Sequence, residues 1–159
     1  MAIVSFKAGE DISAGDAVFV SSTGFLYKAI ATEFENSSVV GIAINGGSAG
    51  SLIRVNADSV YDSSSTFVPG VTQYLSLTTS GAYTDYDSLN SDLGLTSYEG
   101  VYLTQVGKAL TTSKLEVETS LPFFIRNPTS IFILESSTGI SLDAILLEDG
   151  STISLETAS

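Results

Sequence analysis

Cysteine and histidine are both absent from this chain of 159 residues. Without cysteine, disulfide bonds, thiolate catalysis and sulfur-ligated metal sites are all excluded. Without histidine, the chain lacks the commonest general base and the commonest ligand of transition metals. Together the two absences argue against an enzyme more strongly than any motif argues for one. We therefore expect neither a catalytic centre nor a cofactor.

Basic residues are also scarce: 6 Lys and Arg stand against 18 Asp and Glu, which gives a net charge of −12. A surface of this sign repels a phosphate backbone, so we expect no binding to nucleic acid. It repels an anionic membrane surface for the same reason. Because only 15% of the residues are charged, we expect apolar surface to be hidden in an assembly.

Long hydrophobic runs are missing as well. No segment approaches the roughly 20 apolar residues that a membrane helix needs. Residues 1–7 do not show the basic start and apolar stretch of a signal peptide. We therefore expect a soluble protein that is made in the cytoplasm. With 43% hydrophobic residues, the chain can bury one core, with or without an appended segment.

What the chain does contain is a pattern typical of β-strands. Apolar and polar residues alternate, β-branched and aromatic types are plentiful, and helical spacing is rare. The clearest case is a strand over residues 39–44, a glycine-rich turn over 45–50 and a second strand over 51–55. Residues 3–7 alternate in the manner of a short edge strand. The sequence thus predicts an all-β fold.

The order of these signals occurs twice along the chain. Each half has a Gly turn, a strand, a Ser/Thr-Gly hairpin, a Tyr-bearing strand, a connection, a Val-Gly-x-Ala strand, a turn and a strand ending in Val. The Val-Gly-x-Ala segments are residues 40–43 and 106–109, whose small side chains leave room for another backbone to approach. We predict a small β-barrel or sandwich over residues 1–120, built from a duplicated four-strand unit. Convergence of short strands with Gly turns is the alternative interpretation.

Residues 85–100 interrupt the second half, and we expect a surface insertion in which one helical turn ends at Gly94. Asp85, Asp87 and Asp92 within it offer carboxylate oxygens for a hard cation such as calcium. Their spacing departs from that of the EF-hand calcium loop. We therefore expect a solvated loop and no metal site.

Two further patterns resemble functional sites only in part. Glu116 and Glu118 flank Val117, so both carboxylates lie on one face of a strand, as in a paired-carboxylate acid/base site. The solvent face of an ordinary strand has the same pattern, and we prefer that interpretation. Residues 46–50 are glycine-rich but lack the Lys-Ser/Thr of a phosphate-binding loop and precede no predicted helix. We interpret them as a hairpin turn.

Residues 121–159 are predicted to form a separate C-terminal β-hairpin arm. An apolar link at 123–125 is followed by two similar segments, 133–143 and 146–156, each with the strand–turn–strand pattern of a β-hairpin. Isolated hairpins are marginally stable in water. We expect them either to pair with a neighbour's sheet edge or to complete the chain's own sheet. The residues expected at an interface are Phe123, Phe124, Ile125, Ile133, Leu134, Leu146 and Leu147.

With these features assembled, the chain resembles a family of small β-rich phage virion proteins, the head decoration or capsid cement proteins. The resemblance covers residues from about 8 to about 118. The segments that carry it are residues 14–18, 24–29, 40–43, 49–50, 69–70, 74–76, 106–110 and 115–117.

The resemblance implies a protein without catalytic residues that binds the outer face of an assembled capsid, as a trimer or a dimer. Its partners are then the major capsid protein and other copies of itself, and its location is the virion exterior. Tail-fibre and baseplate modules share these motifs, so a tail, fibre or baseplate adaptor is the first alternative. A carbohydrate-binding module is the second, and it predicts an exposed aromatic cleft.

Overall fold

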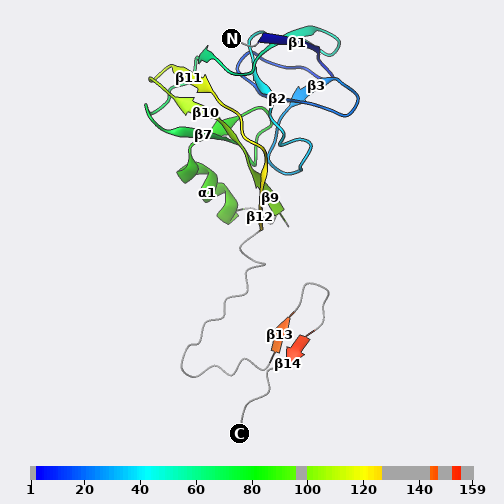
Figure 1. Cartoon of the computed structure of the whole chain (residues 1–159), viewed down its shortest axis with the longest axis vertical. Coiled ribbons are helices and arrows are strands. Elements are labelled where there is room, and N and C mark those ends of the chain that lie inside the picture. Colours follow the sequence, from blue (N-terminus) through cyan, green and yellow to red (C-terminus); the bar gives the residue numbers. More distant parts are fainter. Residues whose placement is uncertain (1–2, 96–99, 127–143, 147–151, 155–159) are drawn as a thin grey trace.

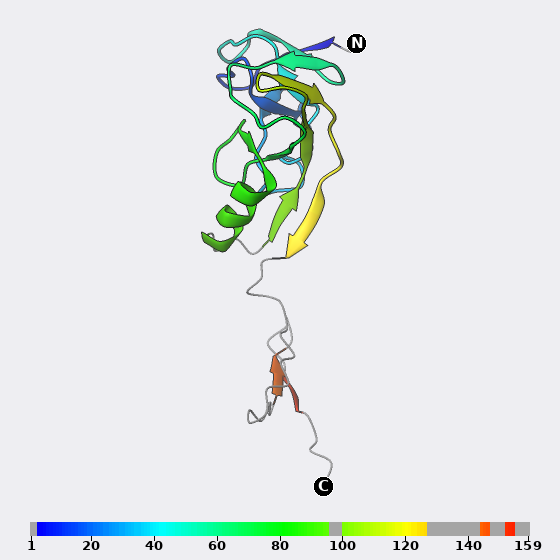
Figure 2. The same cartoon turned by 90° about the vertical axis from the view of Figure 1, so that its left-hand side faces the viewer.

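The computed structural model describes residues 3–95, 100–126, 144–146 and 152–154. Antiparallel β-sheets with one short helix make up this part of the chain, which confirms the all-β prediction. The main body holds two five-stranded sheets. A two-stranded ribbon and the helix α1 (Tyr86–Leu95) lie at the end of this body away from β1 (Figures 1 and 2). Among the described residues, no helix is long and apolar enough to cross a membrane.

The first sheet has the strand order β1-β5-β4-β2-β3, and all neighbouring strands are antiparallel. Its strands are β1 (Ile3–Lys7), β2 (Ala17–Val20), β3 (Leu26–Lys28), β4 (Gly41–Ala43) and β5 (Leu52–Asn56). β1 lies at the edge, as its sequence pattern predicts. Successive side chains of β2 point to opposite faces, and both faces are covered: Phe19 packs in one core cluster and Val18 in another.

The second sheet has the strand order β6-β11-β10-β7-β8, again antiparallel throughout. Its strands are β6 (Val60–Asp62), β7 (Thr72–Leu75), β8 (Tyr83–Thr84), β10 (Gln105–Ala109) and β11 (Lys114–Val117). Along β11, Leu115 and Val117 are buried, and the alternate residues Lys114 and Glu116 are exposed. This sheet therefore has one face on the core and one in solvent.

The two sheets have the same strand order when β1 to β5 are matched in turn with β6, β7, β8, β10 and β11. The repeated order that the sequence predicts is thus present, but each unit has five strands and not four, because β1 and β6 each pair beside the last strand of their unit. The hairpins match as well. Gly24, between β2 and β3, has a φ of 83°, and Gly81, between β7 and β8, has a φ of 78°, values that favour glycine.

One hydrophobic cluster joins both units into a single core. Ile42 of β4 and Val106 of β10 belong to it, although these two strands lie in different sheets and do not pair with each other. A second cluster, which includes Ile53, lies within the first unit. Backbone bonds also connect the units: the Ala17 amide donates to the Gly81 carbonyl at 2.8 Å. The predicted domain of residues 1–120 therefore has a shared core.

The insertion in the second unit differs from the prediction. α1 extends from Tyr86 to Leu95, so the expectation of one turn ending at Gly94 is wrong. The Ser88 amide donates to Asp85 Oδ1 at 2.8 Å, which caps the first turn. Leu89 is buried in the core cluster that joins the units. Tertiary packing of this kind stabilises a short helix that intrinsic propensity alone does not.

Only part of the predicted C-terminal arm lies within the described residues. β13 (Ala144–Leu146) pairs antiparallel with β14 (Thr152–Ser154), and Ile145 lies opposite Ile153. These two strands overlap the second predicted copy, residues 146–156: β14 lies inside it, and β13 begins two residues before it. The first copy, segment 133–143, with Ile133 and Leu134, lies outside the described residues, and so does Leu147.

Candidate interaction surface

The two-stranded ribbon of β9 (Gly100–Leu103) and β12 (Phe123–Arg126) has two different faces. Phe124 lies opposite Tyr102, and Ile125 lies opposite Val101. Because side chains alternate along a strand, these two pairs point to opposite sides of the ribbon. Val101 is buried, and Ile125 packs against the core cluster. Of the predicted interface residues, Ile125 therefore contacts the chain's own core.

The other face of the ribbon carries a row of aromatic rings, which we call the aromatic row: Phe34, Tyr102 and Phe124. The Tyr102 ring lies 5.9 Å from that of Phe34, at 67°, and 5.3 Å from that of Phe124, at 57°. Phe34 is 61% exposed and Phe124 is 48% exposed. Aromatic pairs with this spacing and tilt attract one another, so the rings stabilise one arrangement while much of their surface stays in water.

Two more large apolar side chains are exposed close to Phe124 in the sequence. Leu121 is 88% exposed and Phe123, the first residue of β12, is 69% exposed. We call these two residues together with the aromatic row the apolar end surface. A concentration of exposed apolar side chains on a well-formed element marks an interaction site more often than single exposed residues do. The predicted interface residues Phe123 and Phe124 both belong to this surface, Phe124 on the side of the aromatic row and Phe123 on the side of the ribbon that it shares with Ile125.

Phe34, like Tyr102 and Leu121, is a member of this surface that the sequence analysis did not suggest. Residues 31–38 have the polar composition of a simple connection. The segment is nevertheless well fixed. The hydroxyls of Ser37 and Ser38 donate to the Phe34 carbonyl at 3.0 and 2.9 Å. Buried Thr104 donates its hydroxyl to the Ser37 carbonyl at 2.9 Å. These bonds position the Phe34 ring beside Tyr102.

The candidate metal ligands of the insertion have other roles or lie apart. Asp85 caps α1, and the hydrogen bond from the Ser88 backbone amide is the main cause that lowers the pKa of the Asp85 carboxyl. Asp87 and Asp92 lie along the helix itself. In the part of the chain that the structure describes, no group of three or more acidic side chains is arranged to hold a metal ion.

The other two patterns lie on ordinary secondary structure. Glu116 is exposed on β11 opposite Lys108, and Glu118 is exposed just beyond the strand. Neither carboxylate lines the pocket between the two units. The glycine-rich residues 46–50 connect β4 to β5, which pair antiparallel as the hairpin prediction requires.

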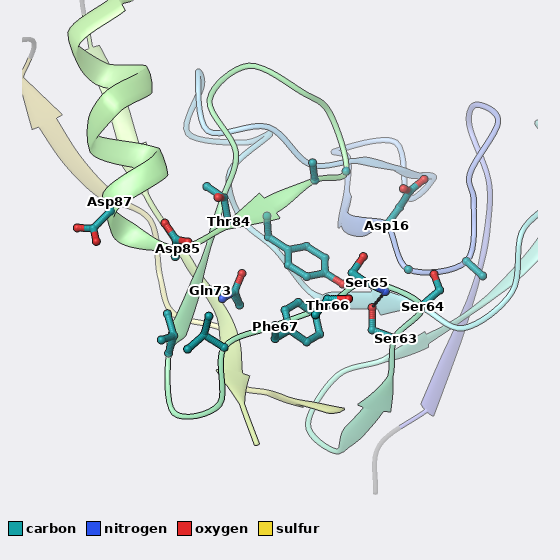
Figure 3. A pocket seen from close by; sticks show the side chains of 17 residues that line it. Asp16, Ser63, Ser64, Ser65, Thr66, Phe67, Gln73, Thr84, Asp85 and Asp87 are labelled. Atoms are coloured by element: carbon teal, nitrogen blue, oxygen red, sulfur yellow. Dashed lines mark hydrogen bonds between the residues drawn. The ribbon is translucent and has the colours of Figure 1, made fainter. Parts of the chain in front are cut away.

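That pocket lies where the two units meet and has a volume of about 650 Å³ (Figure 3). Asp16 reaches it from the first unit, and Tyr83 on β8 reaches it from the second. Burial is the main cause that raises the pKa of Tyr83 to about 12, and the negative charge of Asp16 adds to it. The sequence did not predict this pocket, since its residues come together only through the packing of the two units.

No family model matches this chain, and no curated protein matches it at a significant level. Its function therefore has to be argued from its own residues and their arrangement.

Proposed function

We propose that this chain is a non-enzymatic structural protein of a phage virion, which binds the outer surface of the capsid and cements neighbouring major capsid subunits. The observation that carries the proposal is the apolar end surface. Phe and Tyr are among the residue types enriched at the centre of protein–protein interfaces. Here they are exposed at one end of a body whose core is shared by two sheets.

The composition supports a role in an assembly. A chain with 15% charged residues and an exposed apolar surface loses unfavourable contact with water when a partner covers that surface. Contacts that are individually weak become strong when many linked copies make them together on a repeating lattice. A homo-oligomer on a capsid meets this condition, and both a trimer and a dimer are compatible with it.

The geometry of the aromatic row favours a protein partner over a carbohydrate. Tyr102 is tilted by 67° from Phe34 and by 57° from Phe124. The three rings therefore do not form the flat platform on which sugar rings stack. A tail, fibre or baseplate adaptor is the alternative that would use the same surface.

Copy number in purified virions separates the two virion roles. Quantitative mass spectrometry of particles that contain the chain should give a number of copies comparable with that of the major capsid protein. A few copies per particle would instead identify a tail, fibre or baseplate component and would refute the cement role.

Rebinding to capsids tests the apolar end surface directly. Capsids prepared without this protein are incubated with the wild-type chain or with a Phe123→Ser/Phe124→Ser double variant, and bound protein is measured after sedimentation. We expect the double variant to lose most of its binding. Phe25→Ser is the matched control, because Phe25 is also exposed but lies in the β2–β3 turn. Equal binding by the wild type and the double variant would remove the apolar end surface from the proposal.

A further inference from the structure

The pocket between the units is lined by oxygen-bearing side chains and two aromatic rings. Asp16 comes from the turn before β2, Gln73 from β7 and Tyr83 from β8, while Phe67 comes from the segment between β6 and β7 (Figure 3). The rings of Phe67 and Tyr83 are stacked, with centroids 6.3 Å apart and planes 23° from parallel. A volume of about 650 Å³ lies in the range of pockets that hold small molecules or short chain segments.

The charge of this lining has one sign. Asp16, Asp85 and Asp87 contribute carboxylates, and no Lys or Arg is among the lining residues. Two of the carboxylates are held by backbone amides: Asp16 Oδ2 accepts from Ser13 at 2.8 Å, and Asp85 Oδ1 accepts from Ser88 at 2.8 Å. These bonds fix the negative groups in place before any ligand arrives, which lowers the entropy lost on binding.

Gln73 gives an independent indication of a ligand. Its side chain is only 6% exposed, yet it lines the pocket and points into it (Figure 3). The side-chain amide makes no hydrogen bond to the residues drawn around the pocket. A polar group that faces a cavity and makes no bond to the residues drawn around it can accept a ligand in place of water. Its carbonyl oxygen adds an acceptor to those of the carboxylates.

We propose that this pocket binds a cationic side chain, a guanidinium or a primary ammonium, presented by a basic segment of a partner protein. Carboxylate and amide oxygens accept hydrogen bonds from such a group, and stacked aromatic rings at the pocket wall attract its charge. The net charge of −12 steers a basic segment toward the protein. This inference goes beyond the proposed virion role and holds for any partner with a basic segment.

Two other ligand classes fit the lining less well. A bound metal ion needs several ligands converging on one point, and no group of three or more acidic side chains among the described residues does so. A neutral saccharide can donate its hydroxyls to the carboxylates and the amide, but it leaves uncompensated a negative charge that no basic side chain in the lining balances. The observed charge therefore selects the cationic ligand.

A matched pair of small probes tests the proposal on the full chain. N-acetyl-arginine amide carries the guanidinium, and N-acetyl-citrulline amide has nearly the same shape without the charge. NMR titration of the protein should show the arginine probe shifting the signals of the Gln73 side-chain amide and the Tyr83 ring, with binding that weakens as salt is added. Equal shifts with both probes, no shift with either, or shifts from a neutral disaccharide alone would overturn the proposal.

Substitution of the carboxylates locates the interaction. Asp16→Asn and Asp87→Asn remove one charge each, and asparagine at position 16 keeps an oxygen that accepts from the Ser13 amide. We expect each variant to bind the arginine probe about tenfold more weakly. Asp92→Asn is the control, since it removes the same charge from α1 but lies outside the pocket. If all three variants weaken binding equally, the effect is one of net charge and the assignment to this pocket fails.

Discussion

Gly41 and Gly107 occupy equivalent positions in the two units, and each lies against a backbone carbonyl of the neighbouring strand. A Cβ atom on Gly41 would be 2.2 Å from the Asn56 carbonyl oxygen, and one on Gly107 would be 2.2 Å from the Glu116 carbonyl oxygen. The two carbonyls belong to β5 and β11, the equivalent last strands of the units. Each Val-Gly-x-Ala motif therefore uses its glycine for the close approach of a strand within its own sheet.

Alanine at either glycine should destabilise the fold. The added methyl group meets backbone and not the end of a flexible side chain, so the strands must separate. We expect Gly41→Ala and Gly107→Ala each to lower the free energy of unfolding by about 1–3 kcal/mol or more, measured by urea denaturation. Lys108→Ala is the control: its side chain is exposed on the same strand, and its effect should stay within about 0.5 kcal/mol. A Gly107→Ala protein as stable as this control would contradict the steric argument.

The repeated strand order was predictable because it depends on local signals. Turn glycines such as Gly24 and Gly81 and the alternation of apolar residues mark strands and hairpins along the sequence. β6 was harder to find, since Val60–Asp62 is short and lies among Ser and Asp residues. Its pairing with β11 is a long-range contact that no local pattern records. β1 was predicted as an edge strand, but neither β1 nor β6 was assigned to a repeated unit, and each unit was therefore predicted with four strands.

For the candidate surface, too, local sequence patterns were predictive and long-range contacts were not. Phe123 and Phe124 were predicted from their apolar segment alone. Phe34 was missed because its exposure becomes meaningful only beside Tyr102, which lies far away in the sequence. Ile125 was placed at the interface with its neighbours, but alternation along β12 turns it toward the core. The sequence located the segment, and only the strand pairing revealed which of its side chains face outward.

The opposite orientation of neighbouring residues in β12 gives a direct test. Ile125→Ala should destabilise the protein by about 1 kcal/mol or more, because it removes methyl groups that pack on the core. Phe124→Ala should cost less than Ile125→Ala, because Phe124 points to the other side of β12 and is 48% exposed. Urea denaturation of both variants measures the difference. The reverse ranking would show that β12 faces the core with its other side.

The hydrogen bond from Thr104 to Ser37 should make a measurable contribution to stability. Thr104→Val keeps the shape of the side chain but removes this donor. The Ser37 carbonyl still accepts from the Val39 amide at 3.0 Å, so we expect the cost of one hydrogen bond, about 0.5–1.5 kcal/mol. Thr104→Ser keeps the hydroxyl and should lose less. Thermal unfolding compares the two variants, and fluorescence or NMR of Tyr102 reports whether the aromatic row changes. Equal stability of the Val and Ser variants would show that the bond contributes nothing.

The helix cap at Asp85 predicts a dependence on acid pH. The pKa of this carboxyl is lowered in the folded protein from its ordinary value of 3.8. Folding therefore gains stability from the ionised cap above pH 3.8, and this gain is lost as the pH falls through the lower, folded-state pKa. Asp85→Ala should cost about 1 kcal/mol at neutral pH, while Asp85→Asn should retain most of the cap. Amide exchange of α1, measured against pH, should lose its acid sensitivity in Asp85→Asn.

Tyr83 predicts a second dependence, at alkaline pH and with the opposite direction. Its pKa is raised from 10.0 to about 12, mainly because burial disfavours the phenolate. Above pH 10 the unfolded chain releases this proton while the folded protein retains it, so unfolding becomes easier as the pH rises toward 12. The loss from this one group should reach about 2 kcal/mol, measured by urea denaturation at a series of alkaline pH values.

Tyr83→Phe isolates the contribution of this phenol, because the ring stays and the titrating group is removed. The variant should lose less stability than the wild type between pH 10 and 12, whatever its stability at neutral pH. Tyr86→Phe serves as the comparison, since Tyr86 is 53% exposed on α1. If Tyr83→Phe and the wild type lose the same free energy over this range, the Tyr83 phenol is not buried at the junction of the units. The pocket would then be more open than the packing of Tyr83 against Phe67 indicates.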